Sequence, residues 1–185
     1  MKINVILITY NQEKYIRQAV DSILMQHFDG EVEIIVADDC SIDNTYDIIS
    51  SYKEQTKFKF RFLERESNLG ISKNYQRAFS ACEGEYIAVL EGNDYWCNSY
   101  RLQKHVDFLE EHRECVMSWN PFIRYYESTN KYVYPGLKTN NDVEFIALDD
   151  LLLGNRIPNF SSCVYRGSVI KKMNPALFDV KVKNI

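Results

Sequence analysis

The stretch from Tyr86 to Trp96 constrains the fold of this chain more than any other, because a short apolar run ends abruptly in acidic and polar residues. Its first part, Tyr-Ile-Ala-Val-Leu, is apolar without alternation, which is typical of a buried parallel strand. Its second part begins Glu-Gly-Asn-Asp. In open α/β sheets, ligands bind just beyond the carboxyl ends of such strands, and carboxylates placed there commonly hold a divalent cation that also contacts a phosphate. The stretch therefore predicts an α/β fold with a ligand site at one sheet edge.

The same alternation of apolar runs and amphipathic segments extends over the first 113 residues. We expect strands over 3–8, 32–37, 58–64 and 86–90. We expect one helix that follows Asn11 as its cap, a second that is capped near Ser41 or Asp43, and two more over 72–82 and 100–113. This order predicts a mostly parallel twisted sheet with helices on both faces. Beyond it we expect a shorter mixed part, with strands over 116–126, 131–134 and 161–166, a helix over 146–153 and a helical turn over 168–173.

Length, charge and cysteine content narrow the class of protein. At 185 residues the chain is long enough for one domain, and we treat 1–185 as a single domain. The net charge of −4 and the dispersed basic residues argue against nucleic acid as a partner. Five cysteines without a Cys-x-x-Cys pair predict free thiols in a reducing cytoplasm. We see no signal peptide and no apolar stretch long enough to span a membrane.

Three polar clusters follow the predicted strands: Thr9-Tyr10-Asn11, Asp38-Asp39, and Glu91 to Asp94. A single aspartate after a strand usually caps a helix or a turn, but three clusters at one edge of a sheet favour a ligand site. Carboxylates repel a bare phosphate, so a phosphorylated ligand needs a cation between them. Mg²⁺ or Mn²⁺ suits one or two carboxylates together with ligand phosphates.

Other residues at this edge suit a nucleotide diphosphate. Asp38 or Asp39 is placed to accept hydrogen bonds from a base or from ribose hydroxyls. A second group, Asn68, Gly70, Lys73 and Asn74, precedes or opens a helix, where backbone N–H groups and a lysine can contact a diphosphate. For Lys73, a solvated helix residue is an equally good interpretation. The chain has neither the Gly-rich dinucleotide fingerprint after its first strand nor a P-loop.

Four motifs together resemble those of family 2 glycosyltransferases. They are Val5-Ile6-Leu7-Ile8-Thr9-Tyr10-Asn11, Val36 to Thr45 (Val-Ala-Asp-Asp-Cys-Ser-Ile-Asp-Asn-Thr), Asn68 to Asn74 (Asn-Leu-Gly-Ile-Ser-Lys-Asn) and Leu90 to Trp96. The likeness covers about residues 3–100 in motifs and continues more loosely to about 170. It implies the GT-A fold, a nucleotide-diphospho-sugar donor, which we expect to be UDP-linked, and Mg²⁺ or Mn²⁺ as the cofactor.

The resemblance also implies roles for individual residues. Thr9, Tyr10, Asn11 and Glu13 are similar to the first nucleotide-contacting loop, and Asp39 to the carboxylate that reads the base or the ribose. Lys73 stands where the family often has a basic residue near the diphosphate. Asp94 resembles the direct metal ligand, and Glu91 is its expected partner.

Two departures from the family pattern matter. Asn93 stands where the metal motif usually has an aspartate. Its amide can bind a ribose but carries no charge, so we place the ligand role on Glu91 and Asp94 and count Asn93 with the donor-binding residues. The acidic motif that usually supplies the catalytic base has no match here, because the residues around Asp179 differ from that motif. We therefore expect the base beyond Ile185, in a chain truncated at its C-terminus.

The implied function is transfer of a sugar to a saccharide or lipid-linked acceptor, with inversion, in bacterial cell-surface polysaccharide synthesis. We expect donor binding in residues 1–98 and acceptor binding in 99–185, in the cytoplasm or peripherally at the inner face of the cytoplasmic membrane. The alternatives are a catalytically incomplete nucleotide-sugar-binding domain, a nucleotidyltransferase, whose Gly-rich loop is missing here, and a structural α/β domain. For the tyrosines at 125, 126, 132 and 134, we favour a hairpin packed on the sheet over stacking on a sugar.

Overall fold

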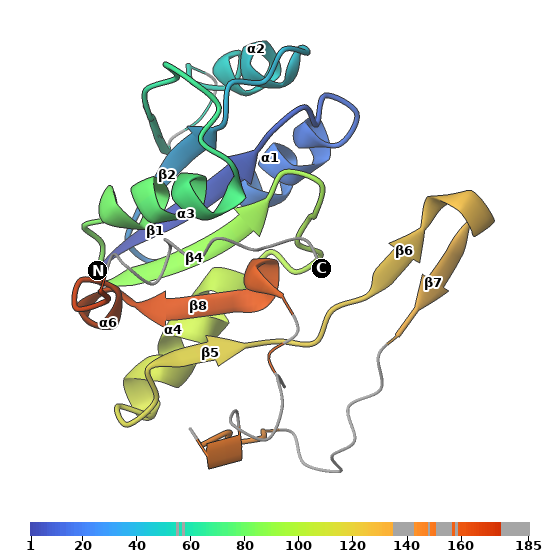
Figure 1. Cartoon of the computed structure of the whole chain (residues 1–185). Helices are drawn as coiled ribbons and strands as arrows, with labels where there is room; N and C mark the ends of the chain where they lie inside the picture. The colour runs from blue at the N-terminus through green and yellow to red at the C-terminus, as the bar shows by residue number, and fades with distance from the viewer. Residues whose placement is uncertain are drawn as a thin grey trace.

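A computed structural model describes residues 1–54, 56, 58–134, 143–147, 149–150, 157 and 159–174. Its main feature is a six-stranded sheet in the order β3-β2-β1-β4-β8-β5 (Figure 1). Four neighbouring strands are parallel: β1 (Lys2–Thr9), β2 (Glu31–Asp38), β3 (Lys59–Phe62) and β4 (Tyr86–Glu91). The last two, β5 (Met117–Trp119) and β8 (Cys163–Arg166), pair antiparallel. The predicted mostly parallel α/β fold is therefore confirmed.

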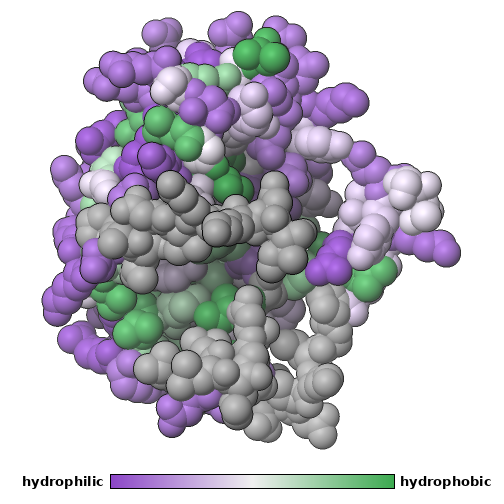
Figure 2. Space-filling view, viewed as in Figure 1, coloured by the Kyte–Doolittle hydropathy of each residue, from purple (hydrophilic) through white to green (hydrophobic). Residues whose placement is uncertain are grey.

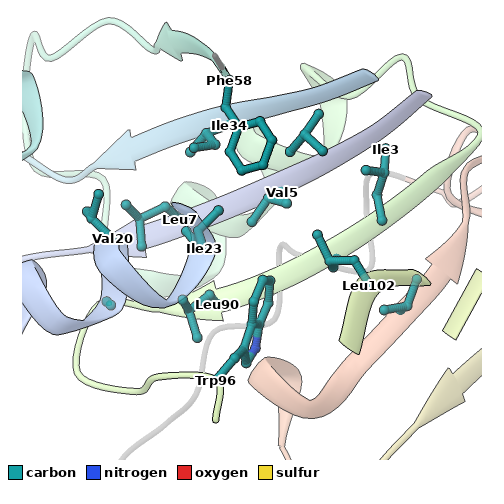
Figure 3. Packing of buried hydrophobic residues seen from close by; sticks show 14 of the residues in the cluster. Ile3, Val5, Leu7, Val20, Ile23, Ile34, Phe58, Leu90, Trp96 and Leu102 are labelled. Atoms are coloured by element: carbon teal, nitrogen blue, oxygen red, sulfur yellow. The ribbon is translucent and has the colours of Figure 1, made fainter. Parts of the chain in front are cut away.

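Apolar side chains bury both faces of this sheet under helices. One core joins β1, β2 and β4 to α1 (Ile16–Leu24), α2 (Thr45–Ser50) and α4 (Arg101–Glu111), and Figure 3 shows Val20, Ile23 and Leu102 of this cluster pointing at the strands. A second core joins the opposite face to α3 (Ile71–Ser80). Because β1 is buried on both faces, its apolar residues run without alternation.

Two of our local predictions are wrong. Asn11 does not cap α1: its φ of 52° is left-handed, its amide oxygen accepts from the N–H of Ile42, and the helix begins only at Ile16. The strand expected over 116–126 is two strands in different sheets. Pro121, which has no N–H to donate, lies between them. The second of them, β6 (Arg124–Tyr126), pairs instead with β7 (Lys131–Val133) in a separate hairpin.

Smaller differences concern the ends of elements. A short 3₁₀ helix, η2 (Phe160–Ser162), precedes β8, and the last helix, α6, spans Gly167–Ile170. Another 3₁₀ turn, η1 (Glu127–Thr129), connects β6 to β7. The helix expected over 146–153 lies largely outside the described residues, and so does Asp179. Among the helices that the structure describes, none is long and apolar enough to cross a membrane.

Asn4 is a polar side chain in the middle of the buried strand β1, and its contacts explain its presence. Its amide oxygen accepts from the N–H groups of Glu83 (2.9 Å) and Gly84 (2.6 Å), and its amide nitrogen donates to Glu33 (2.9 Å). It thus fixes the turn that leads into β4.

We expect Asn4→Ala to lower the free energy of unfolding by about 3 kcal/mol, because two N–H groups lose their acceptor at a buried site. Urea unfolding measures this loss. Unchanged stability would show that these hydrogen bonds do not hold the turn.

His105 of α4 is buried as a neutral imidazole. Its Nε2 donates to Asn120 (3.0 Å), whose amide oxygen also accepts from Arg101, and its Nδ1 accepts from Ser118 (2.7 Å). Burial, and then the neighbouring charge of Arg101, lower the pKa of His105 to about 4.

This pKa predicts a loss of stability in acid. The unfolded imidazole has a pKa of about 6.5, so between pH 6.5 and about 4 the unfolded chain binds a proton that the folded chain does not. The stabilisation is therefore complete above pH 6.5 and falls by about 3 kcal/mol as the pH drops to 4. Urea unfolding at pH 7 and 4.5 should show a steeper decline for the wild type than for His105→Gln; parallel declines would contradict the assignment.

Candidate functional site

The three polar clusters lie side by side at one edge of the sheet. In the register, Thr9 of β1 is level with Asp38 of β2, and Ile8 is level with Glu91 of β4. The order β2-β1-β4 thus places the segments after these three strands next to one another, at the arrowheads in Figure 1. The structure therefore brings together the residues that the sequence suggested for a ligand site.

The loop after β1 contacts the loop after β4 directly. The Thr9 hydroxyl donates to the Gln12 side chain (2.9 Å), which in turn donates to the side-chain oxygen of Asn93 (3.2 Å). Gly92 lies against both, since a Cβ placed there would meet the Thr9 hydroxyl oxygen at 2.9 Å and would overlap Gln12. Because glycine has no side chain, it leaves room for this close approach, which brings the Asn93 region up to the end of β1.

A second set of hydrogen bonds joins the loop after β1 to the loop after β2. The N–H of Asn11 donates to the hydroxyl of Ser41 (2.9 Å), and the Glu13 carboxylate accepts from the N–H (3.1 Å) and the side chain (2.9 Å) of Asn44. Tyr10, between them, remains exposed. Asn11 and Glu13 therefore shape the loop, while Tyr10 presents its ring to the solvent.

Asp38 is almost fully buried, and its charge is neutralised locally. Its carboxylate forms an ion pair with Arg65 (2.7 Å) and accepts from both the N–H (3.0 Å) and the hydroxyl of Ser41. The Arg65 guanidinium also stacks over the ring of Tyr46, 3.9 Å from its centroid. These contacts hold the start of the loop after β2.

Asp39 performs a different task at the same strand end. Its two carboxylate oxygens accept from the N–H groups of Leu69 (2.8 Å) and Gly70 (2.9 Å), and its carbonyl accepts from the Asn68 amide (2.9 Å). Gly70 has a φ of 79°, a conformation that glycine adopts without strain. Asp39 therefore fixes the 68–70 turn beside the end of β2, immediately before α3.

The first turn of α3 contains one buried and one exposed candidate. Asn74 is buried, donates to the carbonyl of Ala37 (2.8 Å) and accepts from Arg77 (2.7 Å). Lys73 is exposed and, among the residues that the structure describes, makes no hydrogen bond or ion pair. Its ammonium group is thus available to a ligand, whereas Asn74 anchors the helix to β2.

Glu91 and Asp94 are the two carboxylates at the end of β4. Glu91 accepts from the Tyr75 hydroxyl (2.5 Å), and burial together with this carboxylate raises the pKa of Tyr75, which keeps it a neutral donor. Asp94 accepts a long hydrogen bond from Asn159 (3.4 Å). Both side chains are half-buried.

The carboxylates at this edge suit a cation that also binds a ligand phosphate. Within the described part of the chain, no group of three or more His, Cys, Asp and Glu side chains could hold a metal by itself. Mg²⁺ and Mn²⁺ commonly take only one or two protein carboxylates and complete their shell with phosphate oxygens and water. Asp94 and Glu91 are therefore the candidate ligands at this edge for a cation that arrives with a diphosphate.

Sequence reasoning missed several residues that build this edge. Gln12 bridges two loops, Arg65 neutralises Asp38, and Arg77 donates to the carbonyls of Glu64 and Asp38 (2.8 Å to the latter). The signal for Arg65 was its place just after the third strand, whose carboxyl end we had left out of the edge, whereas Arg77 lies within α3.

Comparison with known proteins gives a consistent result. The model of the family described as glycosyl transferase family 2 matches residues 4–172. An uncharacterized protein of Mycobacterium tuberculosis is 38% identical over 164 residues, which are 88% of this chain and 46% of that protein. The putative teichuronic acid biosynthesis glycosyltransferase TuaG of Bacillus subtilis is 32% identical over 121 residues, 65% of this chain and 46% of that protein.

Among solved structures, residues 1–349 of TarS of Staphylococcus aureus superpose with a TM-score of 0.71 and 29% identity, over 92% of this chain and 48% of that one. The same region in complex with UDP-GlcNAc gives a TM-score of 0.69 and 27% identity, over 92% and 47%. The relative of this name is a poly(ribitol-phosphate) beta-N-acetylglucosaminyltransferase. The chain spans about half the length of the Mycobacterium and Bacillus relatives.

Proposed function

Because this chain belongs to glycosyl transferase family 2, we propose that its sheet edge binds a nucleotide-diphospho-sugar and that the protein transfers the sugar to a saccharide or lipid-linked acceptor. The observation that carries the proposal is the convergence of the loops after β1, β2 and β4, with Asp94 and Glu91 beside the loops that Thr9 and Asp39 anchor. The fold is the GT-A fold of TarS.

We propose UDP as the nucleotide, because a likeness of 27% identity extends to a TarS structure that contains UDP-GlcNAc. Exposed residues of the edge, such as Tyr10, Lys73 and Asn93, face this donor, and the buried Thr9 and Asp39 shape the loops that contact it. We assign Thr9, Tyr10, Asn11, Glu13, Asp39 and Asn93 to the nucleoside side, and Asn68, Gly70 and Lys73 to the diphosphate. Asp38 and Asn74, whose polar atoms already bind neighbouring residues, hold the loops in place.

Asp94 and Glu91 would hold Mg²⁺ or Mn²⁺. Such a cation neutralises charge that develops on the departing nucleoside diphosphate. Lys73, an exposed cation at the start of α3, supplies a second positive charge near the same oxygens. Tyr75 orients Glu91 through its hydroxyl. The chain's own residues thus bind the donor and stabilise its leaving group, with residues 1–98 as the donor half and 99–185 on the acceptor side.

The names of TarS and TuaG place these relatives in the synthesis of bacterial surface polymers. We propose the same class of pathway for this protein, with a cytoplasmic supply of donor. Asn93 favours a second candidate function, a domain that binds a nucleotide sugar without turnover, because an amide replaces the charge of a carboxylate at the metal motif.

Incubation of the chain with UDP-GlcNAc and Mn²⁺, followed by measurement of UDP release, tests the proposal. We expect slow release that stops on chelation of the metal. Binding of UDP-GlcNAc without release supports the second candidate, and absence of both binding and release contradicts the donor site itself.

A further inference from the structure

The hairpin β6–β7 carries tyrosines that the core does not use. Figure 1 shows it extending away from the sheet, and Figure 2 shows the same projection with a mostly pale or purple surface. Tyr125 is 44% exposed and Tyr132 56% exposed. The expectation that this hairpin packs on the sheet is therefore wrong, and its aromatic rings need another explanation.

The two rings form a fixed pair on one face of the hairpin. Tyr125 and Tyr132 are opposite each other in the register, and their ring centroids are 4.8 Å apart. The hydroxyl of Tyr125 donates to Asn130 (2.9 Å) in the turn. Because side chains alternate along a strand, the charged residues Arg124 and Lys131 belong to the opposite face. The tyrosine face is therefore aromatic, hydroxylated and free of strand charges.

The pair lies next to the candidate donor site. The hydroxyl of Tyr15, at the start of α1, donates to Glu127 in the hairpin turn (2.9 Å). This hydrogen bond ties the hairpin to the start of α1, directly after the loop that follows β1.

We propose that Tyr125 and Tyr132 form a platform on which an uncharged sugar ring of the acceptor stacks. A pyranose has an apolar C–H face and a hydroxylated rim, which match an aromatic face with hydroxyl groups at its edge. The absence of charge on the tyrosine face favours a neutral ring over a phosphate or a carboxylate. The proposal rests on the proposed function, because a sugar ring stacked here can act as the acceptor only if the neighbouring sheet edge binds the donor.

The test uses Tyr125→Ala/Tyr132→Ala and, as a matched control, Tyr100→Ala, which removes another exposed tyrosine with a ring partner, His27 at 4.9 Å. Chitotetraose, cellotetraose and maltotetraose serve as probes in saturation-transfer NMR, each with and without UDP and Mn²⁺. We expect at least one probe to bind through its ring C–H protons, about tenfold more weakly to the double variant than to the wild type or the control. Tyr125→Phe, which keeps the ring, should bind like the wild type.

Failure of the platform and failure of the donor site give different results. If no probe binds, or if the double variant binds as well as the wild type, the platform is wrong. If instead the double variant alone loses self-association in sedimentation, the face joins two copies of the chain and the proposal is overturned. UDP affinity should be equal in all variants. Absence of UDP binding in the wild type would contradict the donor site, and the NMR measurement with the sugar probes would still decide whether the platform exists.

Discussion

Asp94→Asn is expected to weaken Mn²⁺-dependent UDP binding by about 100-fold, because it removes the carboxylate best placed to hold the cation against the diphosphate. The substitution preserves shape and keeps an oxygen that can accept from Asn159. Since Asn93 already replaces one charge of the motif, the site would retain only Glu91 as an anionic ligand. Isothermal titration with UDP, with and without Mn²⁺, measures the effect.

Asp107→Asn is the matched control for this experiment. Asp107 is exposed on α4, where it accepts from Gln103 (2.7 Å), away from the edge. The Asp107→Asn variant should bind UDP with the affinity of the wild type. Metal-dependent binding of undiminished strength in Asp94→Asn would move the ligand role to other residues.

Asp39→Ala is expected to reduce both stability and donor affinity. The carboxylate accepts two backbone N–H bonds from Leu69 and Gly70, and their loss should lower the free energy of unfolding by about 2–3 kcal/mol. The 68–70 turn then loses its anchor to β2, so UDP affinity should fall by at least about tenfold. Urea unfolding and titration with UDP measure the two effects separately.

Asp47→Ala removes an exposed carboxylate from the first turn of α2 and serves as the control. It should change stability by less than about 0.5 kcal/mol. If Asp39→Ala destabilises the fold but binds UDP normally, the residue is purely structural and its assignment to the nucleoside side is wrong.

The architecture could be predicted from the sequence because its signals are local. The strands β1, β2 and β4 are continuous apolar runs, and each ends in polar residues. The alternation of strands and helices then predicted a mostly parallel sheet with helices on both faces. The same reasoning placed Thr9, Asp38 and Glu91 at one edge of the sheet.

The details that failed depend on contacts between distant segments. Asn11 has a side chain that commonly caps helices, but its backbone is left-handed and its amide oxygen accepts a hydrogen bond from the N–H of Ile42. Asn11 therefore joins two loops instead of capping a helix. Nothing local reveals that Arg65 pairs with Asp38 or that Gln12 reaches Asn93. Our prediction that the β6–β7 hairpin packs on the sheet was wrong because a strand with alternating aromatic residues can pack on a sheet or project into solvent.

The central claim is that the carboxyl edge of the sheet binds a nucleoside diphosphate through a divalent cation. Isothermal titration of UDP into the chain, in Mn²⁺ and again after chelation, tests it most directly. We predict saturable one-to-one binding in Mn²⁺ that weakens at least about tenfold when the metal is removed. Absence of UDP binding in Mn²⁺, or equal binding with and without the metal, would contradict the claim.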